Sequence, residues 1–170
     1  MEFLETIKKK QCSVINFWSK SNKLLQNKGL NLITKTKITV VGSGYVGMSL
    51  AVLLAQRNEV VVLDVDASRV QKVNSKQSTV ADTEIEAFLA EKELSLTATL
   101  DKQLAYEGAS FVVVATPTNY DTDTNRFDTS SVDSVVSDAL ELNADAFVVV
   151  KSTIPVGHIK SLQEKHDTDR

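Results

Sequence analysis

Runs of apolar, mostly β-branched residues recur along the chain and predict strands of a parallel sheet. They lie at 37–41, 59–64, 111–115 and 146–150. The runs at 111–115 and 146–150 are continuously apolar, which is typical of strands that are buried on both faces of such a sheet. Residues 94–99 instead alternate apolar with polar side chains, and this alternation predicts a half-exposed edge strand.

Segments with apolar residues at helical spacing separate these strands. We expect helices from the glycines after the first strand up to residue 57, and at 67–74, 82–92, 100–109, 130–142 and 157–165. The helix at 82–92 carries acidic residues in its first turn, and the helix at 130–142 begins with a hydroxyl residue as its cap. Residues 116–129 are polar and predict a loop.

The alternation of strand and helix predicts an α/β fold with a doubly wound, Rossmann-like parallel sheet, which binds ligands at the carboxyl ends of its strands. In the strand order 3-2-1-4-5-6 of such sheets, the strand at 146–150 is the fifth. No sixth strand follows before Arg170, so we expect a truncated sheet and a domain, 37–170, that is incomplete at its C-terminal end. The uncovered edge predicts self-association with another chain.

Residues 1–36 differ from the rest and form a basic leader segment. Apolar residues recur there at a loose helical period, interrupted by polar residues such as Gln11, Ser13 and Asn16. One interpretation is an amphipathic helix that docks on a membrane surface or on a partner. The interruptions favour the other interpretation, a leader helix that lies on its own domain.

Composition limits the classes of function. With 170 residues, of which 42% are hydrophobic and 24% charged, the chain is long enough for one domain with a core. Residues 1–37 hold eight Lys and two Glu (net +6), and the rest holds eleven basic and twenty acidic residues (net −9), which argues against nucleic acid as a partner. The single cysteine, Cys12, excludes a disulfide framework, and with two histidines it cannot form a metal cluster. This cysteine usage fits a reducing, cytoplasmic setting, and no apolar run approaches membrane-spanning length.

The main chemical signal is Gly42-Ser-Gly44-Tyr-Val-Gly47, which follows the first strand and opens a helix. In this pattern the first glycine permits a sharp turn, the second leaves room for a pyrophosphate, and the third lets the helix lie close to the sheet. Asp64 ends the second strand twenty positions after Gly44, where an acceptor for the ribose hydroxyls belongs, and its charge favours NAD over NADP. The alternatives are an ordinary glycine turn, and Asp64 as a helix cap; Asp66 takes the ribose role if the strand ends two residues later.

Three loops at expected strand ends carry a family resemblance. They are the glycine turn, Thr116-Pro-Thr-Asn-Tyr120 and Ser152-Thr-Ile-Pro-Val-Gly157. From about Lys37 to Arg170 the chain resembles the amino-terminal domain of the UDP-glucose 6-dehydrogenases, within the wider UDP-glucose/GDP-mannose dehydrogenase group. The pairing of the last two loops is far more specific than the glycine pattern. The resemblance implies an enzyme that uses two NAD⁺ to oxidise the C6 alcohol of UDP-glucose to a carboxylate.

The resemblance also implies roles for individual residues. Thr153 matches a catalytic threonine beside the nicotinamide and the reacting carbon, where it helps to order water and the developing oxyanion; the alternative is a cap for the following helix. Arg69 matches a basic residue near the adenosine or is a solvated helix charge, and Thr118 matches a cofactor contact or caps its strand. Lys151 is interpreted as a strand-end charge. The full set expected to bind NAD is Gly42, Ser43, Gly44, Tyr45, Val46, Gly47, Asp64, Arg69, Thr116, Pro117, Thr118, Ser152 and Thr153, with no metal site.

The chain also departs from the family pattern. The family's catalytic cysteine, with an assisting lysine and aspartate, lies in a downstream region without a counterpart here, and Cys12 precedes the first strand. We therefore expect the NAD-binding part of the enzyme, inactive alone, with UDP-glucose a substrate of the full-length protein. The alternatives are a non-catalytic module that binds nucleotide or caps a partner, and another hydride-transfer enzyme of this fold, which the two threonine-containing loops disfavour.

Overall fold

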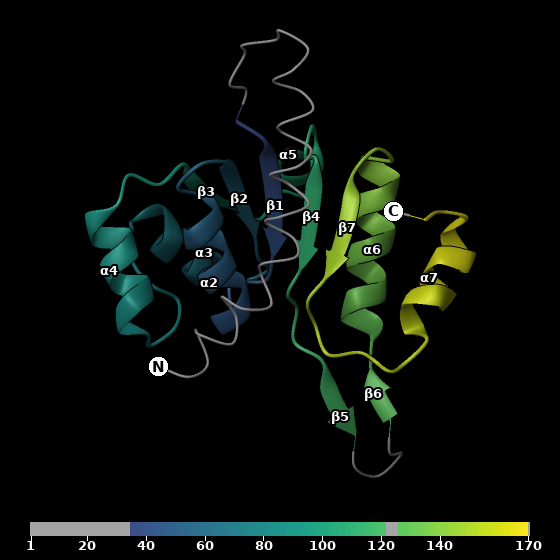
Figure 1. The fold of residues 1–170 in the computed structure, drawn as a ribbon. Coiled ribbons are helices and arrows are strands. Elements are labelled where there is room, and N and C mark those ends of the chain that lie inside the picture. The colour runs from purple at the N-terminus through teal and green to yellow at the C-terminus, as the bar shows by residue number, and fades with distance from the viewer. Residues whose placement is uncertain (1–34, 122–125, 170) are drawn as a thin grey trace, which may run out of the picture. The chain divides into compact units, whose positions relative to one another are not determined.

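The computed structural model describes residues 35–121 and 126–169 of the chain (Figure 1). The expected leader segment, 1–36, therefore lies outside the described residues except for Lys35 and Thr36. Within the described part, no helix is long and apolar enough to cross a lipid bilayer.

The central sheet contains five parallel strands, β1 (Lys37–Val41), β2 (Glu59–Leu63), β3 (Leu96–Thr99), β4 (Phe111–Val114) and β7 (Phe147–Val150). Their spatial order is β3-β2-β1-β4-β7. β1 lies at the centre, so that Val40 is opposite Val62 on one side and Val113 on the other. This order confirms the predicted Rossmann-like fold, with the strand near 146–150 in fifth place.

Helices cover both faces of the sheet. They are α2 (Tyr45–Leu54), α3 (Ala67–Asn74), α4 (Thr83–Glu91), α5 (Lys102–Tyr106), α6 (Ser130–Leu142) and α7 (His158–His166). Successive strand side chains point to opposite faces. Val40 therefore belongs to the same hydrophobic cluster as Met48 of α2, whereas Val41 belongs with Ala105 of α5 and Ala139 of α6. The core thus consists of two apolar layers, one on each face of the sheet (Figure 1).

Most helix boundaries agree with the pattern of apolar residues. α3 and α6 have the predicted bounds, and α4 carries Glu84 and Glu86 in its first turn as expected. α5 is shorter than the predicted 100–109, because Asp101 caps its first turn and Gly108, with a φ of 68°, turns the chain away after it.

The predicted hydroxyl cap of α6 is wrong. The residue at the cap position, Thr129, makes no side-chain capping hydrogen bond. Instead the backbone N–H of Ser130 donates to Oδ1 of Asp128, at 3.0 Å. Hydrogen bonds from Ser130 lower the pKa of the Asp128 carboxyl below its ordinary value of 3.8. The carboxylate of Asp128, just before the helix, therefore accepts a hydrogen bond from the first helical amide, as aspartate does at many turns.

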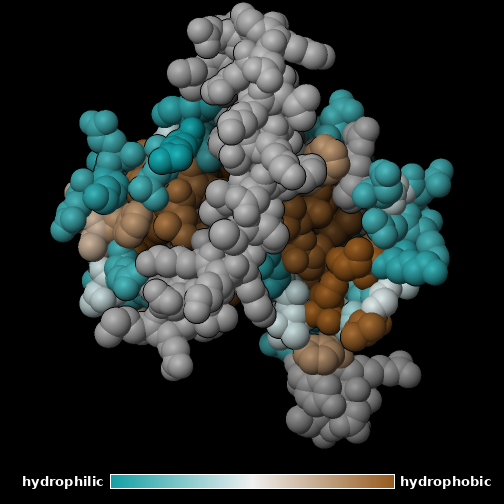
Figure 2. All heavy atoms as spheres, viewed as in Figure 1, coloured by the Kyte–Doolittle hydropathy of each residue, from teal (hydrophilic) through white to brown (hydrophobic). Residues whose placement is uncertain are grey.

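β7 is less buried than predicted. Val112, Val113 and Val114 of β4 are buried, but Val148–Val150 of β7 are half-buried and Phe147 is 52% exposed. The prediction of a strand buried on both faces is therefore wrong for this run. In the described sheet β7 is the last strand and pairs with β4 only, so fewer side chains cover it. Figure 2 shows hydrophobic surface near β7, beside the hydrophilic outer side of α7.

A two-stranded antiparallel hairpin stands apart from the central sheet. It consists of β5 (Asn119–Asp121) and β6 (Arg126–Asp128). Figure 1 shows it projecting beyond the carboxyl ends of β4 and β7. The sequence predicted only a loop here, because strands of three residues are too short to reveal an alternating pattern.

Candidate functional site

The three glycines in the turn after β1 differ in how much room their surroundings leave for a side chain. Gly42 has a φ of 98°, and a Cβ there would lie 2.7 Å from the carbonyl oxygen of Ala115, at the end of β4. A Cβ on Gly47 would lie 1.8 Å from the carbonyl oxygen of Gly42. Both positions therefore require glycine, the first for the sharp turn and the second for close packing of α2. Gly44 is different, because a Cβ there would meet no atom within 4 Å.

Open space at Gly44 lies at the N-terminus of α2. Gly44 is the cap residue of this helix, makes no side-chain capping hydrogen bond, and has no acidic residue in the turn that follows. The first amides of a helix lack intrahelical partners and carry partial positive charge. This end of α2 therefore suits a phosphate group, and the open space is where one fits against bare backbone.

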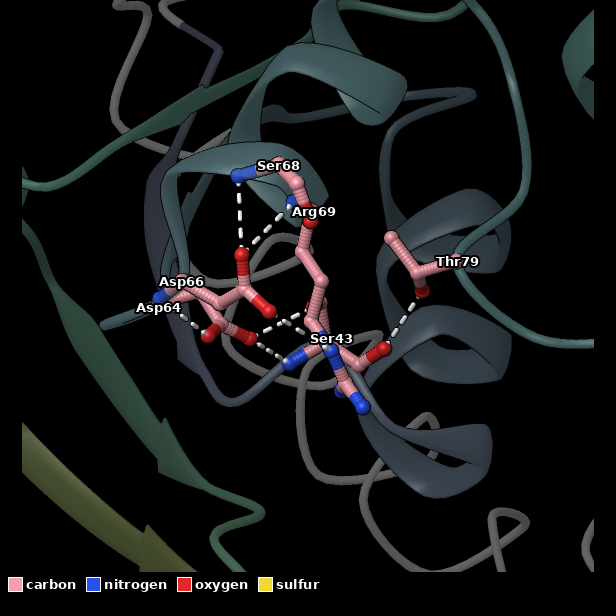
Figure 3. A network of polar contacts seen from close by, with 6 residues as sticks. All are labelled: Ser43, Asp64, Asp66, Ser68, Arg69 and Thr79. Atoms are coloured by element: carbon pink, nitrogen blue, oxygen red, sulfur yellow. Dashed lines mark hydrogen bonds and ion pairs between the residues drawn. The ribbon is translucent and has the colours of Figure 1, made fainter.

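Asp64, just after β2, is bound to the glycine turn (Figure 3). Its Oδ2 atom accepts hydrogen bonds from the backbone N–H and the hydroxyl of Ser43, at 2.8 and 2.5 Å, and its Oδ1 atom accepts from the N–H of Asp66, at 3.0 Å. The side chain of Ser43 is buried and turned toward Asp64. Asp64 thus links the end of β2 to the turn, which places a carboxylate next to the α2 N-terminus.

Asp66, not Asp64, caps the following helix, so the alternative reading of Asp64 as a helix cap is wrong. The Oδ1 atom of Asp66 accepts from the backbone N–H groups of Ser68 and Arg69, at 2.8 and 3.4 Å. Hydrogen bonds from Ser68 are the main cause that lowers the pKa of Asp66 below its ordinary 3.8. Arg69 is 43% exposed, with its Nε atom 3.8 Å from Oδ2 of Asp66. In Figure 3 its side chain extends toward the glycine turn.

A second group of expected residues meets where the loops after β4 and β7 come together. The hydroxyl of Ser152 donates to the carbonyl oxygen of Thr116, at 2.7 Å. Ser131, in the first turn of α6, donates to the carbonyl oxygen of Pro117 at 2.9 Å and lies 3.2 Å from the Thr116 hydroxyl. Three hydroxyl groups, of Thr116, Ser131 and Ser152, therefore hold these two loops and the α6 N-terminus together.

Thr153 and Thr118 lie on these loops, and their hydroxyls are without a hydrogen-bond partner among the described residues. Thr153 is exposed and Thr118 half-buried, and neither side chain hydrogen-bonds within 35–121 or 126–169. Gly157 occupies the cap position of α7, so the alternative role of Thr153 as a cap of that helix is wrong. Lys151 is exposed and forms no ion pair with the described residues.

The sequence patterns did not point to two residues near the carboxyl ends of the strands, Ser131 and Thr79. Ser131 was overlooked because it falls within a helix pattern, although its place in the first turn after a strand-end loop was an available signal. Thr79, which donates to the carbonyl oxygen of Ser43 at 2.5 Å, lies in the connection between α3 and α4, where no motif points to a site.

The two groups of residues lie at the same edge of the sheet. The backbone N–H of Ala115 donates to the carbonyl of Val41 at 2.9 Å, and that of Lys151 donates to the carbonyl of Val114 at 2.8 Å, so the ends of β1, β4 and β7 are adjacent. An extended dinucleotide could therefore have its pyrophosphate at Gly44, its adenosine toward Asp64 and its nicotinamide toward the loops after β4 and β7. Among the described residues, no group of three or more His, Cys, Asp or Glu side chains is arranged to hold a metal ion.

Sequence comparison finds relatives of known activity. The profile of the UDP-glucose/GDP-mannose dehydrogenase family, NAD binding domain, matches residues 36–169. UDP-glucose 6-dehydrogenase from Streptococcus pneumoniae is 50% identical over 134 residues, which are 79% of this chain and 34% of that protein. UDP-glucose 6-dehydrogenase from Campylobacter jejuni is 41% identical over 131 residues, 76% of this chain and 33% of that protein. The chain thus spans about a third of the length of these relatives.

Solved structures share the fold. UDP-D-ManNAc dehydrogenase from Pyrococcus horikoshii matches with a TM-score of 0.70 at 24% identity, over 78% of this chain and 32% of that chain. GDP-mannose dehydrogenase from Pseudomonas aeruginosa matches with a TM-score of 0.66 at 22% identity, over 77% of this chain and 33% of that chain. Each of these structural matches covers more than three quarters of the chain. The chain therefore belongs to the UDP-glucose/GDP-mannose dehydrogenase family, and residues 36–169 correspond to its NAD-binding domain.

Proposed function

We propose that this chain is the NAD-binding part of a UDP-glucose 6-dehydrogenase, which oxidises the C6 alcohol of UDP-glucose to the carboxylate of UDP-glucuronate. Each turnover consumes one water and reduces two NAD⁺ to two NADH. The observation that carries the proposal is the open, uncapped N-terminus of α2 at Gly44, next to the carboxylate of Asp64. The activity of the pneumococcal relative supports the choice of substrate, because half of the matched residues are identical.

When bound, NAD⁺ supplies the hydride acceptor. The chain's own residues would hold and orient it: the amides at Gly44 and in the first turn of α2 the pyrophosphate, and Asp64 the hydroxyls of the adenosine ribose. The loops that bear Thr118 and Thr153 would hold the nicotinamide end. The Thr153 hydroxyl, exposed on its loop, is available to hydrogen-bond the alcohol oxygen of the substrate or a water molecule.

The second oxidation, from aldehyde to acid, is not expected from this chain alone. That stage uses a nucleophile that adds to the aldehyde. Cys12 lies outside the residues that match the family, and Thr153 has no general base in hydrogen-bonding contact among the described residues. We therefore expect NAD⁺ binding by this chain without steady turnover of UDP-glucose.

The test is a calorimetric titration of NAD⁺ into the wild type and into Gly44→Val. Gly44 tolerates a side chain, because its φ of −76° suits an L residue and no atom lies within 4 Å of the Cβ position, and the branched valine side chain would occupy the space proposed for the pyrophosphate. We expect the variant to melt like the wild type and to bind NAD⁺ at least tenfold more weakly. Equal affinity would contradict the proposed site. Steady NADH absorbance with UDP-glucose would contradict the expected inactivity of the isolated chain.

We further propose that two copies of this chain associate through β7, because this strand has one strand neighbour in the described sheet and is half-buried. The cytoplasmic location expected from composition stays a prediction, which cell fractionation tests.

A further inference from the structure

Side chains from outside the glycine turn hold both peptide groups that flank Ser43. The N–H of Ser43 donates to Oδ2 of Asp64 at 2.8 Å. The carbonyl oxygen of Ser43 accepts from the hydroxyl of Thr79 at 2.5 Å, across 36 positions of sequence (Figure 3). Asp64 follows β2, and Thr79 lies between α3 and α4. The orientation of each peptide in the turn is therefore fixed from a different part of the domain.

The bond from Thr79 also determines where the next amide points. In a planar trans peptide the C=O and N–H bonds point in opposite directions. Because the Ser43 carbonyl faces Thr79, the N–H of Gly44 faces away from the α3–α4 connection. This N–H has no acceptor among the described residues, and the space beside Gly44 is open. The amide is therefore presented to a ligand at the N-terminus of α2.

Glycine makes this peptide easy to turn over. A residue before glycine can reverse its following peptide plane at low cost, because glycine accepts either sign of φ. The connection that carries Thr79 is itself held in place, since the next residue, Val80, packs against the core on the α2 face. The half-buried Thr79 is thus a fixed donor that selects one of two peptide orientations.

We propose that Thr79 is a positioning residue for the NAD pyrophosphate: by holding the Ser43 carbonyl, it aims the Gly44 N–H at the phosphate oxygens. The proposal rests on NAD⁺ binding at the N-terminus of α2. The α3–α4 connection is then a determinant of cofactor affinity. In the described hydrogen bonds, the Ser43 carbonyl is the part of the glycine motif that this connection contacts.

The experiment compares Thr79→Val, Thr79→Ser and Ser78→Ala. Valine keeps the shape of threonine but cannot donate, serine keeps the hydroxyl, and Ser78→Ala removes a neighbouring hydroxyl bond that does not reach the turn. Affinities for NAD⁺ and for ADP-ribose, which carries the same pyrophosphate, are measured by calorimetry. We expect Thr79→Val to weaken both about three- to tenfold, as the loss of one hydrogen bond predicts, and the other two variants to bind within about twofold of wild type.

Amide NMR spectra supply a readout that a loss of stability would not produce. In the wild type, ADP-ribose should shift the Gly44 amide resonance strongly, and in Thr79→Val this shift should shrink while that of the rest of α2 persists. Binding by the wild type with no loss in Thr79→Val, or an equal loss in Ser78→Ala, would overturn the role of Thr79 and leave the NAD site intact. Failure of the wild type to bind NAD⁺ would overturn the proposed function as well.

Discussion

At the residue scale, Asp64 holds the glycine turn through Ser43, and the proposed function gives it a second task as the acceptor for the adenosine ribose hydroxyls. Replacement by alanine would leave the buried N–H and hydroxyl of Ser43 without their acceptor, and would therefore affect folding and binding together. Replacement by asparagine separates the tasks better, since an amide oxygen still accepts from Ser43 while the charge is lost. Only the N–H of Asp66 loses its acceptor, because the amide nitrogen takes the place of Oδ1. Asparagine is thus the more informative variant.

For Asp64→Asn we expect NAD⁺ binding to weaken by about 1.5–3 kcal/mol, the value of a hydrogen bond to a charged group. The preference for NAD⁺ over NADP⁺ should also fall, because the carboxylate no longer repels a 2′-phosphate. Calorimetric titration with both cofactors measures the two effects, with a thermal melt to verify that the turn is intact. An unchanged preference would move the ribose contact away from Asp64.

Tyr106 is a fully buried residue of α5 whose hydroxyl has no hydrogen-bond partner among the described residues. Burial raises the pKa of this phenol above its ordinary value of 10.0, with a smaller contribution from Asp138. Above pH 10 the unfolded chain therefore loses a proton that the folded chain retains, so the folded state loses stability as pH rises. An unpaired buried hydroxyl is also unfavourable at neutral pH.

We expect Tyr106→Phe to raise the free energy of unfolding by about 1 kcal/mol at pH 7. We also expect the variant to lose less stability than the wild type between pH 9 and 11. Urea unfolding across this pH range measures both effects, and Tyr45→Phe, at a position 55% exposed, is the matched control. Destabilisation of Tyr106→Phe would show that its hydroxyl has a partner.

At the element scale, α7 rests on α6 through a short stripe of side chains. Leu162 is 7% exposed in the cluster that includes Val132 and Val136 of α6. On either side of it, His158 Nε2 lies 2.6 Å from Oδ1 of Asp133, and His166 Nε2 lies 3.2 Å from the Ser137 hydroxyl. The contacting residues of α7 are four positions apart, and so are Asp133 and Ser137 of α6, so the contacts line up along the two helices. One apolar side chain and two polar contacts therefore hold α7 against α6.

Leu162→Ala should release α7 and leave the sheet folded. We expect a local loss of about 2–3 kcal/mol, because the substitution removes a buried side chain from a small cluster. Hydrogen exchange should then quicken at least tenfold across α7 and stay unchanged in β1, β2 and β4. Lys160→Ala, at a side chain 81% exposed, is the control. Uniformly faster exchange would mean that α7 and the sheet unfold as one unit.

The success of the sequence predictions differed among elements for physical reasons. α3 and α6 were placed from their apolar spacing, and β1, β2 and β4 from continuous apolar runs, because burial imposes those patterns directly. Burial of β7 could not be predicted, since it depends on which strand lies beside it. The β5–β6 hairpin also escaped prediction, because its three-residue strands bury too little to constrain the sequence.

At the scale of the whole molecule, parallel topology explains why the candidate site could be assembled from sequence. All strands of such a sheet end at one edge, so loops distant in sequence converge there, as those at Thr116 and Ser152 do. The bond from Thr79 to Ser43 could not be predicted, because it joins a side chain to a backbone carbonyl between two loops and leaves no periodic trace. Topology thus predicts where a site lies, and not which side chains support it.

The position of β7 has a consequence for the whole molecule. Its backbone pairs with β4 on one side, and no second strand lies beside it in the described sheet. Val148, Val149 and Val150 offer a half-buried, uncharged, β-branched edge. Edges of this kind pair with other chains unless a charge, a proline or a covering segment prevents it. A second copy of the chain offers the same edge, and two copies can pair about a twofold axis.

We therefore expect concentration-dependent dimers in sedimentation velocity. Val149→Lys should shift the protein toward monomer, because a lysine at an edge strand opposes pairing with a second strand. Leu100→Lys, which replaces a 51% exposed apolar residue just after β3 at the opposite edge of the sheet, introduces the same charge away from β7 and should leave association through β7 unchanged. Thermal melts of both variants verify the fold. A wild type that sediments as a monomer at every concentration would show that the β7 edge is already covered in solution.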